Sequence, residues 1–389
     1  MKIDEKSLKG ARELCALGKY GDAKRIYAEI LQNDPKDLNG LLGMIRIASQ
    51  NYTVYDGQEI EKAIAAARTA AGWVGKVSDR EYDDYAAYAV GRRDASARRE
   101  AYLKAHAGEF VVTGGVLKEY KGVGGEIYIP DGVKEIGDEV FRLKYSLTKV
   151  IFSDGVEKIG SYSFAFCRKL QEVTLPEGLT VLDQGAFSGC VSLEKIRLSQ
   201  TLTKMDAYAF KDCKALTEIE LPAGVKEIGQ GVFEKCSPQL RVRVAAGNAS
   251  FYLKGNCLIG KQDKTLYWAG DKFAIPSGGE AERIRCGAFT GRENLRSIAI
   301  PKGVKTLDLV AFKDCTALEE ISLPKGLEKI GVEGFRNCKS LRRLVIPSTV
   351  KEVGTDAFKG CESLKSILAP EGLSLIHCNR PAGCFVSRK

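Results

Sequence analysis

A repeat of 23 residues runs through most of the 389-residue chain and constrains the fold more than any other feature. Each unit follows the pattern x-P-x-G-[VL]-x-x-[IL]-G-x-x-A-F-x-x-C-x-x-L-x-x-[IV]-x-L. A single unit of this length cannot bury its apolar face, so it must stack on its neighbours, and a fixed period predicts a solenoid. One phenylalanine marks each unit, at Phe141, Phe164, Phe187, Phe210, Phe233, Phe289, Phe312, Phe335 and Phe358.

The strand of each unit is visible as an alternation of apolar and charged residues. In LEKIRL (residues 193–198), Ile196 and Leu198 lie on one side, and Lys195 and Arg197 lie on the other. A period of two is typical of a β-strand with one buried face, so we expect one parallel strand per unit. The segment GLTVL (residues 178–182) supplies a second apolar pair after a turn.

The repeat is interrupted once, between Phe233 and Phe289. We expect the solenoid to occupy residues 108–389, with repeats at about 126–244 and about 275–373. A hairpin insertion at about 245–274 would separate the two sets of repeats.

Residues 1–107 carry a helical pattern instead, with apolar residues recurring every three or four positions. Ala11, Ala23, Tyr27 and Pro35 occupy the small, small, aromatic and proline positions of a 34-residue motif. This stretch therefore resembles one tetratricopeptide repeat. We expect a tetratricopeptide-like helical domain over 1–107, which makes the whole chain α+β and multi-domain.

Cysteine recurs three residues after the phenylalanine, and stacking of the units would align these side chains in a column. Parallel side chains in register keep their Cβ atoms about 4.8 Å apart, beyond the range of about 3.5–4.5 Å that a disulfide prefers. A straight column also offers no tetrahedral metal site. We therefore predict free, buried thiols at Cys167, Cys190, Cys213, Cys236, Cys315, Cys338 and Cys361, with Lys144 and Arg292 taking this position in the first rung of each set.

Several motifs together resemble a known family. The pattern LPxGLxxI…AFxxC, the stretch GVLKEYKGVGGEIYIPDGVKEIG (residues 115–137) and the spacer KGNCLIGKQDKTLYWAG (residues 254–270) are similar to the BspA-like leucine-rich repeats of bacterial surface proteins. The resemblance covers about 110–373. The predicted fold is thus a helical N-terminal module followed by a right-handed parallel β-solenoid of 23-residue leucine-rich repeats. The resemblance implies protein binding and cell adhesion, with attachment of bacteria to host proteins or other cells.

The sequence favours a non-enzymatic protein without metal or cofactor. Histidine occurs only at His106 and His377, and the motifs G-x-S-x-G and H-E-x-x-H are absent. A glycan- or peptide-acting enzyme with a carboxylate pair near residues 249–275 stays open as a remote alternative. The formal net charge of +9 comes without a dense basic run, so nucleic acid is not an expected partner. No apolar stretch approaches the roughly 18 residues of a membrane helix, and we expect no membrane insertion.

The outward strand positions vary from unit to unit, whereas the inward positions barely change. Such a surface is expected to recognise a protein partner, from a host or from bacteria, and glycan is a further possibility. The alternative is a face that only keeps the protein in solution. The candidate partner-binding residues are Lys149, Glu172, Thr174, Lys195, Arg197, Glu218, Glu220, Arg241, Arg243, Glu320 and Arg343.

Two locations are compatible with the sequence. The family resemblance implies the cell surface, whereas the charged start MKIDEKSLKG lacks the apolar core of a signal peptide and implies the cytoplasm. In the second case, the chain would be a cytosolic scaffold that joins two partners, one through each module.

Overall fold

The computed structural model describes residue 23, residues 25–27 and residues 97–389. The chain divides into two compact units, Met1–Ala105 and His106–Lys389. In the first unit, residues 23, 25–27 and 97–105 are helical, and Ala23 and Tyr27 are buried. The rest of the tetratricopeptide-like module predicted over 1–107 lies outside the described residues.

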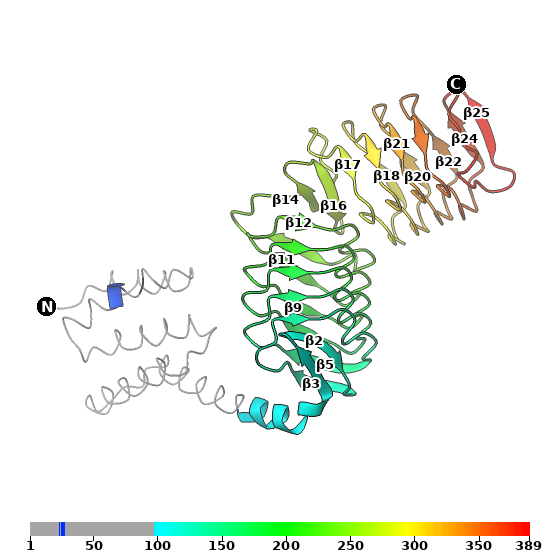
Figure 1. Ribbon diagram of the computed structural model, residues 1–389. Coiled ribbons are helices and arrows are strands. Elements are labelled where there is room, and N and C mark those ends of the chain that lie inside the picture. The colour runs from blue at the N-terminus through cyan, green and yellow to red at the C-terminus, as the bar shows by residue number, and fades with distance from the viewer. Residues whose placement is uncertain (1–22, 24, 28–96) are drawn as a thin grey trace. The chain divides into compact units, whose positions relative to one another are not determined.

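The second unit is a β-solenoid, as the repeat predicted (Figure 1). It begins with a short 3-10 helix, η1 (Ala107–Glu109), and an antiparallel hairpin of β1 (Phe110–Thr113) and β2 (Val116–Tyr120). Strand β2 then pairs in parallel with β4 (Glu135–Ile136), so the hairpin begins the first stack of rungs.

Each regular unit contributes one longer strand, and in the first set of repeats these strands pair into a six-stranded parallel sheet. The inward residues of the strands are buried and most outward residues are exposed, because the alternation of the sequence matches the strand period. The sheet consists of β3 (Gly124–Tyr128), β5 (Ser146–Ile151), β7 (Glu172–Thr174), β9 (Lys195–Arg197), β11 (Glu218–Leu221) and β13 (Arg241–Val244).

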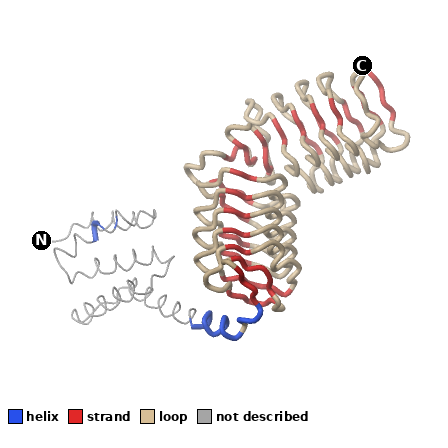
Figure 2. Tube along the Cα trace, viewed as in Figure 1, coloured by secondary structure: helices blue, strands red, loops and turns tan. Residues whose placement is uncertain are grey.

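The second apolar pair of each unit also forms a strand, which the sequence did not predict. These two-residue strands extend the initial hairpin into a separate seven-stranded sheet, so a unit carries two strands and not one. Figure 2 shows the strands as successive rungs joined by loops. The short strands are β4, β6 (Lys158–Ile159), β8 (Val181–Leu182), β10 (Lys204–Met205) and β12 (Glu227–Ile228).

The interruption of the repeat contains an antiparallel meander of three strands. These are β14 (Phe251–Lys254), β15 (Cys257–Gly260) and β16 (Thr265–Ala269). Strand β16 pairs in parallel with β17 (Arg283–Ile284) and so starts the short-strand ladder of the second stack. That ladder continues through β19 (Thr306–Leu307), β21 (Lys329–Ile330) and β23 (Glu352–Val353).

The longer strands of the second stack form two small parallel sheets. One sheet pairs β18 (Ser297–Ala299) with β20 (Glu320–Ser322). The other contains β22 (Arg343–Val345), β24 (Ser366–Ala369) and β25 (Phe385–Arg388).

The phenylalanine of each unit lies in the core, and consecutive rings stack within each of the two sets of repeats. The ring centroids of Phe141 and Phe164 are 4.9 Å apart with an interplanar angle of 10°, and those of Phe289 and Phe312 are 4.8 Å apart at 7°. Stacked aromatic pairs contribute about 0.5–1.5 kcal/mol beyond their buried area. The strict spacing of phenylalanine is therefore a packing requirement.

Candidate functional site

The structure places the candidate partner-binding residues on the outward face of the longer strands. All of them are exposed except Glu218, which is half-buried. Nine lie on one continuous surface over β5, β7, β9, β11 and β13, which we call the charged face. Glu320 and Arg343 belong to the separate sheets of the second stack.

On the charged face, strand register aligns opposite charges in one column. Strand pairing aligns one charged residue from each rung, and the sign of the charge alternates from rung to rung along the column. The residues of this column are Lys149, Glu172, Lys195, Glu218 and Arg241. Lys195 Nζ lies 3.0 Å from Glu172 Oε1, and Arg241 Nη2 lies 3.4 Å from Glu218 Oε2. Alternation avoids the repulsion that like charges would produce on neighbouring strands.

A second column on the same face carries Thr174, Arg197, Glu220 and Arg243. Arg197 Nη2 lies 3.3 Å from Glu177 Oε1, and Arg243 Nη2 lies 3.2 Å from Glu218 Oε1. Both arginine side chains are more than half exposed, so the ion pairs contribute about 0–1 kcal/mol each to stability. Both signs of charge are thus displayed at fixed spacing and stay accessible to a partner.

The corresponding face of the second stack is less charged. Small or apolar side chains occupy most of its outward positions, among them Ala299 and Val345. Glu320 and Arg343 make no ion pair within the described part of the chain. The outward strand faces of the two stacks therefore differ in charge.

The cysteine column is buried and has a bonding role that the sequence did not predict. The eleven cysteines among the described residues are all free thiols. Cys190 Sγ donates to the carbonyl oxygen of Phe164 at 3.1 Å, and the other six thiols of the column repeat this contact with the phenylalanine 26 residues earlier. At the start of the first stack, Lys144 Nζ instead donates to the carbonyl oxygen of Gly122 at 2.9 Å.

Burial makes these thiols poor nucleophiles. It raises the pKa of Cys167, Cys236, Cys315 and Cys361 to about 12, so the thiolate is not populated at neutral pH. Within residues 97–389 and the few described before them, no three His, Cys, Asp or Glu side chains gather as a metal site would require. In the same residues, no helix has the length and apolarity needed to cross a membrane.

A cavity of about 620 Å³ lies where the longer strands are interrupted, and the strand pattern did not reveal it. It is lined by β18, by residues 270–275 and 292–295, and by Pro238 and Gln239. We call it the junction cavity. The sequence did offer one signal: FAIP (residues 273–276) resembles the strand sequence IAIP (residues 298–301), but 25 residues separate the two and not 23.

The solenoid, with its exposed strand ladder, defines a leucine-rich repeat protein. The BspA type leucine rich repeat region matches residues 126–251 and 271–385, which is more than half of the chain. The chain belongs to this family.

Several solved structures are similar to the chain, including the following two. The pneumococcal vaccine antigen PcpA shares 28% identity at a TM-score of 0.54, over 62% of this chain and 61% of PcpA. A leucine rich cell surface protein from Faecalibacterium prausnitzii shares 26% identity at a TM-score of 0.55, over 72% of this chain and 92% of that protein. The match thus spans less than two thirds of the pneumococcal protein. A comparison with curated proteins found no match.

Proposed function

We propose that the chain is a non-enzymatic adhesion protein whose charged face recognises a protein partner. The observation that carries the proposal is the contrast between the two sides of each strand. Inward residues such as Ile196 and Ile219 are buried and nearly constant in type, whereas outward residues such as Arg197 and Glu220 differ between neighbouring rungs. Packing accounts for the first set, and recognition accounts for the variety of the second.

Rigidity suits this surface to recognition. The backbone of each rung is bonded to the next one, so the charged side chains project from a preformed ladder. A preformed surface loses little conformational entropy on binding. The family, and the similarity to a cell surface protein from Faecalibacterium, support a partner outside the cell.

The proposal includes the domain division predicted from the sequence. A tetratricopeptide-like helical domain would occupy 1–107, and the solenoid would occupy 108–389, with repeats at about 126–244 and 275–373.

Binding to host cells tests this function. Fluorescently labelled full-length chain is added to cultured epithelial cells, with and without prior removal of their surface proteins by trypsin. Saturable binding that trypsin abolishes is expected for a protein partner. Binding that survives trypsin but is lost after glycosidase treatment would replace the protein by a glycan, and absence of saturable binding would refute a host-directed adhesion role.

A further inference from the structure

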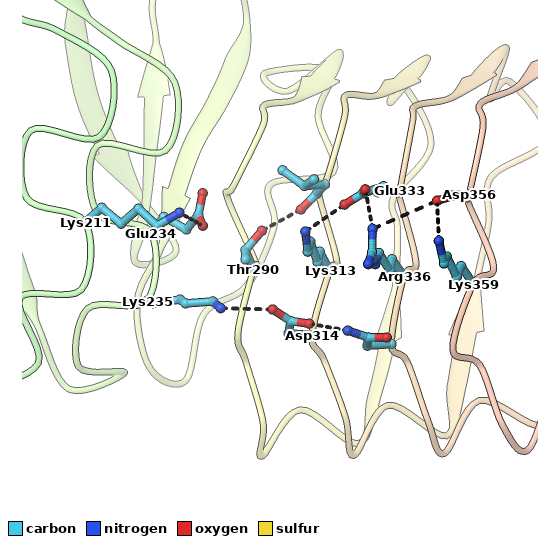
Figure 3. A network of polar contacts seen from close by, with 12 residues as sticks. Lys211, Glu234, Lys235, Thr290, Lys313, Asp314, Glu333, Arg336, Asp356 and Lys359 are labelled. Carbon is cyan, nitrogen blue, oxygen red and sulfur yellow. Dashed lines mark hydrogen bonds and ion pairs between the residues drawn. The ribbon is translucent and has the colours of Figure 1, made fainter. Parts of the chain in front are cut away.

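The two stacks of rungs stay in contact on the side of their turns. The amide nitrogen of Gly231 donates to the carbonyl oxygen of Cys286 at 3.1 Å, although 55 residues separate them. Lys235 Nζ lies 3.0 Å from Asp314 Oδ2, and Figure 3 shows this pair bridging the stacks. These contacts close the turn side of the junction.

On the side of the longer strands, the same junction is open. Strand β13 is the last of its sheet, and among the described strands β18 pairs with β20 alone. Residues 273–276 have the sequence of a rung strand but form none, because the amide nitrogen of Ala274 donates to the carbonyl oxygen of Gly255 in the inserted meander at 2.8 Å. The edge of β18 that faces away from β20 therefore has no strand partner within the described residues.

The junction cavity occupies this opening and has the character of a ligand pocket. Its volume of about 620 Å³ falls within the usual range of about 300–1,000 Å³. Phe273, Ile275 and Ile298 supply apolar lining, and the whole of β18 forms one wall. An extended segment placed in the cavity can reach both the apolar side chains and the unpaired strand edge.

Arg292 supplies a charge in the junction cavity. It occupies the column position that cysteine holds in the following rungs, and it is half-buried. Its guanidinium makes no ion pair or side-chain hydrogen bond within the described part of the chain, whereas Lys144 at the equivalent position bonds to Gly122. The other charged lining residues are exposed, and they are Asp271, Lys272 and Glu293.

We propose that the junction cavity binds an extended peptide segment that carries an acidic side chain. The peptide backbone pairs with the open edge of β18, and the carboxylate accepts hydrogen bonds from the guanidinium of Arg292. Addition of a strand to a sheet edge is a common mode of peptide recognition, and arginine binds carboxylates through two parallel N–H groups. This site is separate from the charged face, so either site can exist without the other.

Peptide libraries test the proposal. Three fluorescein-labelled octapeptide libraries, with Glu, Gln or Lys fixed at a central position, are titrated with the full-length chain and followed by fluorescence polarisation. We expect the Glu library to bind at least tenfold more tightly than the Gln library and the Lys library to bind most weakly. Slower amide hydrogen exchange in residues 297–299 upon binding of the Glu library is expected from strand pairing.

Matched variants connect the result to Arg292. Arg292→Gln is expected to remove the preference for Glu, with at least a tenfold loss of affinity. Arg296→Gln, in an exposed side chain that pairs with Glu319 beside β18, is expected to change affinity less than twofold. Circular dichroism and thermal unfolding establish that both variants are folded.

Several outcomes would overturn the proposal. These are equal binding of the Glu and Gln libraries, no binding of any library, unaltered exchange in β18, or an unchanged preference in a folded Arg292→Gln variant. A dimer of the full-length chain that Arg292→Gln dissociates would make a second copy the occupant. A cross-link from Lys272 to residues 1–96 in the monomer would make the chain its own ligand.

Discussion

Lys235 Nζ and Asp314 Oδ2 lie 3.0 Å apart and join the last rung of the first stack to the second stack. Asp314 also accepts a hydrogen bond from Asn337 Nδ2 at 2.8 Å, so the contact continues into the next rung (Figure 3). Burial tends to raise the pKa of Asp314, but the hydrogen bonds from Asn337 and Lys235 outweigh it and lower the pKa. The carboxylate is therefore charged at neutral pH and holds the junction together.

Asp314→Ala is expected to lower the free energy of unfolding by about 1 kcal/mol, because the substitution removes a partly buried ion pair. Asp212→Ala is the control, since Asp212 has the same turn position and a similar φ of 59° but no ion pair in the described residues. Urea unfolding of both variants measures the difference. Equal losses would show that the ion pair does not stabilise the junction.

The phenylalanine column is expected to carry much of the stability. Phe187 is fully buried between Phe164 and Phe210, so Phe187→Ala should cost about 3–5 kcal/mol. Phe385→Ala is the matched control, and it is expected to change the free energy of unfolding little because Phe385 is 79% exposed. Comparable midpoints of thermal unfolding for the two variants would contradict a packing role for the column.

The 23-residue period was sufficient to predict the solenoid, because every regular rung repeats the same buried residues. The backbone conformation of the residue before each column cysteine could not be predicted from the period. All seven residues that precede a column cysteine have a positive φ, between 57° and 76°, a conformation that favours glycine, asparagine and aspartate. Five of the seven are of these types, and Phe166 and Lys235 are the exceptions. The residue types are visible in the sequence, but the repeat pattern treats this position as variable. The shared backbone conformation is therefore not apparent from the pattern.

The junction cavity could not be predicted from the same pattern. It arises where the repeat is interrupted, and there no neighbouring rung indicates which strand edge stays unpaired. In the sequence, Arg292 stands out only as a substitute for cysteine at the start of a stack. The open edge of β18 depends on the inserted meander, because the amide nitrogen of Ala274 bonds to Gly255 there.

The thiols of the cysteine column should resist alkylation at pH 8. Burial raises the pKa of Cys167 and Cys315 to about 12, so the neutral thiol is favoured in the folded state. The stability that burial of the neutral thiols provides is present below pH 9, which is about the pKa of a cysteine in the unfolded chain. It is lost as the pH rises from 9 towards 12. Iodoacetamide labelling with peptide mapping should modify these cysteines only in denaturant. Labelling in the native protein would contradict the buried column.

Protonation of Glu282 at acid pH is expected to lower the free energy of unfolding. Hydrogen bonds from Lys264 at 2.7 Å and Lys305 at 2.8 Å lower its pKa from 4.5 to about 2. Because the folded-state pKa is depressed, its contribution is present above pH 4.5 and is lost as the pH falls towards 2. Glu282→Gln should therefore flatten the decline of unfolding free energy in this window.

The control for that experiment is Glu371→Gln, which changes an exposed carboxylate without an ion pair in the described residues. Urea unfolding at several pH values between 2 and 5 gives the slope of the unfolding free energy against pH for each variant. A slope for Glu282→Gln equal to that of the unmodified chain would show that the two lysines do not stabilise this carboxylate in solution.

The most direct test of the charged face is the binding of the double variant Arg197→Glu/Arg243→Glu to epithelial cells. The control is Lys226→Glu/Lys325→Glu, which makes the same change in net charge at exposed positions outside the strands. If the charged face recognises the partner, the first variant should lose at least tenfold in apparent affinity while the control keeps the affinity of the unmodified chain. Equal binding of the two variants would contradict recognition through this face.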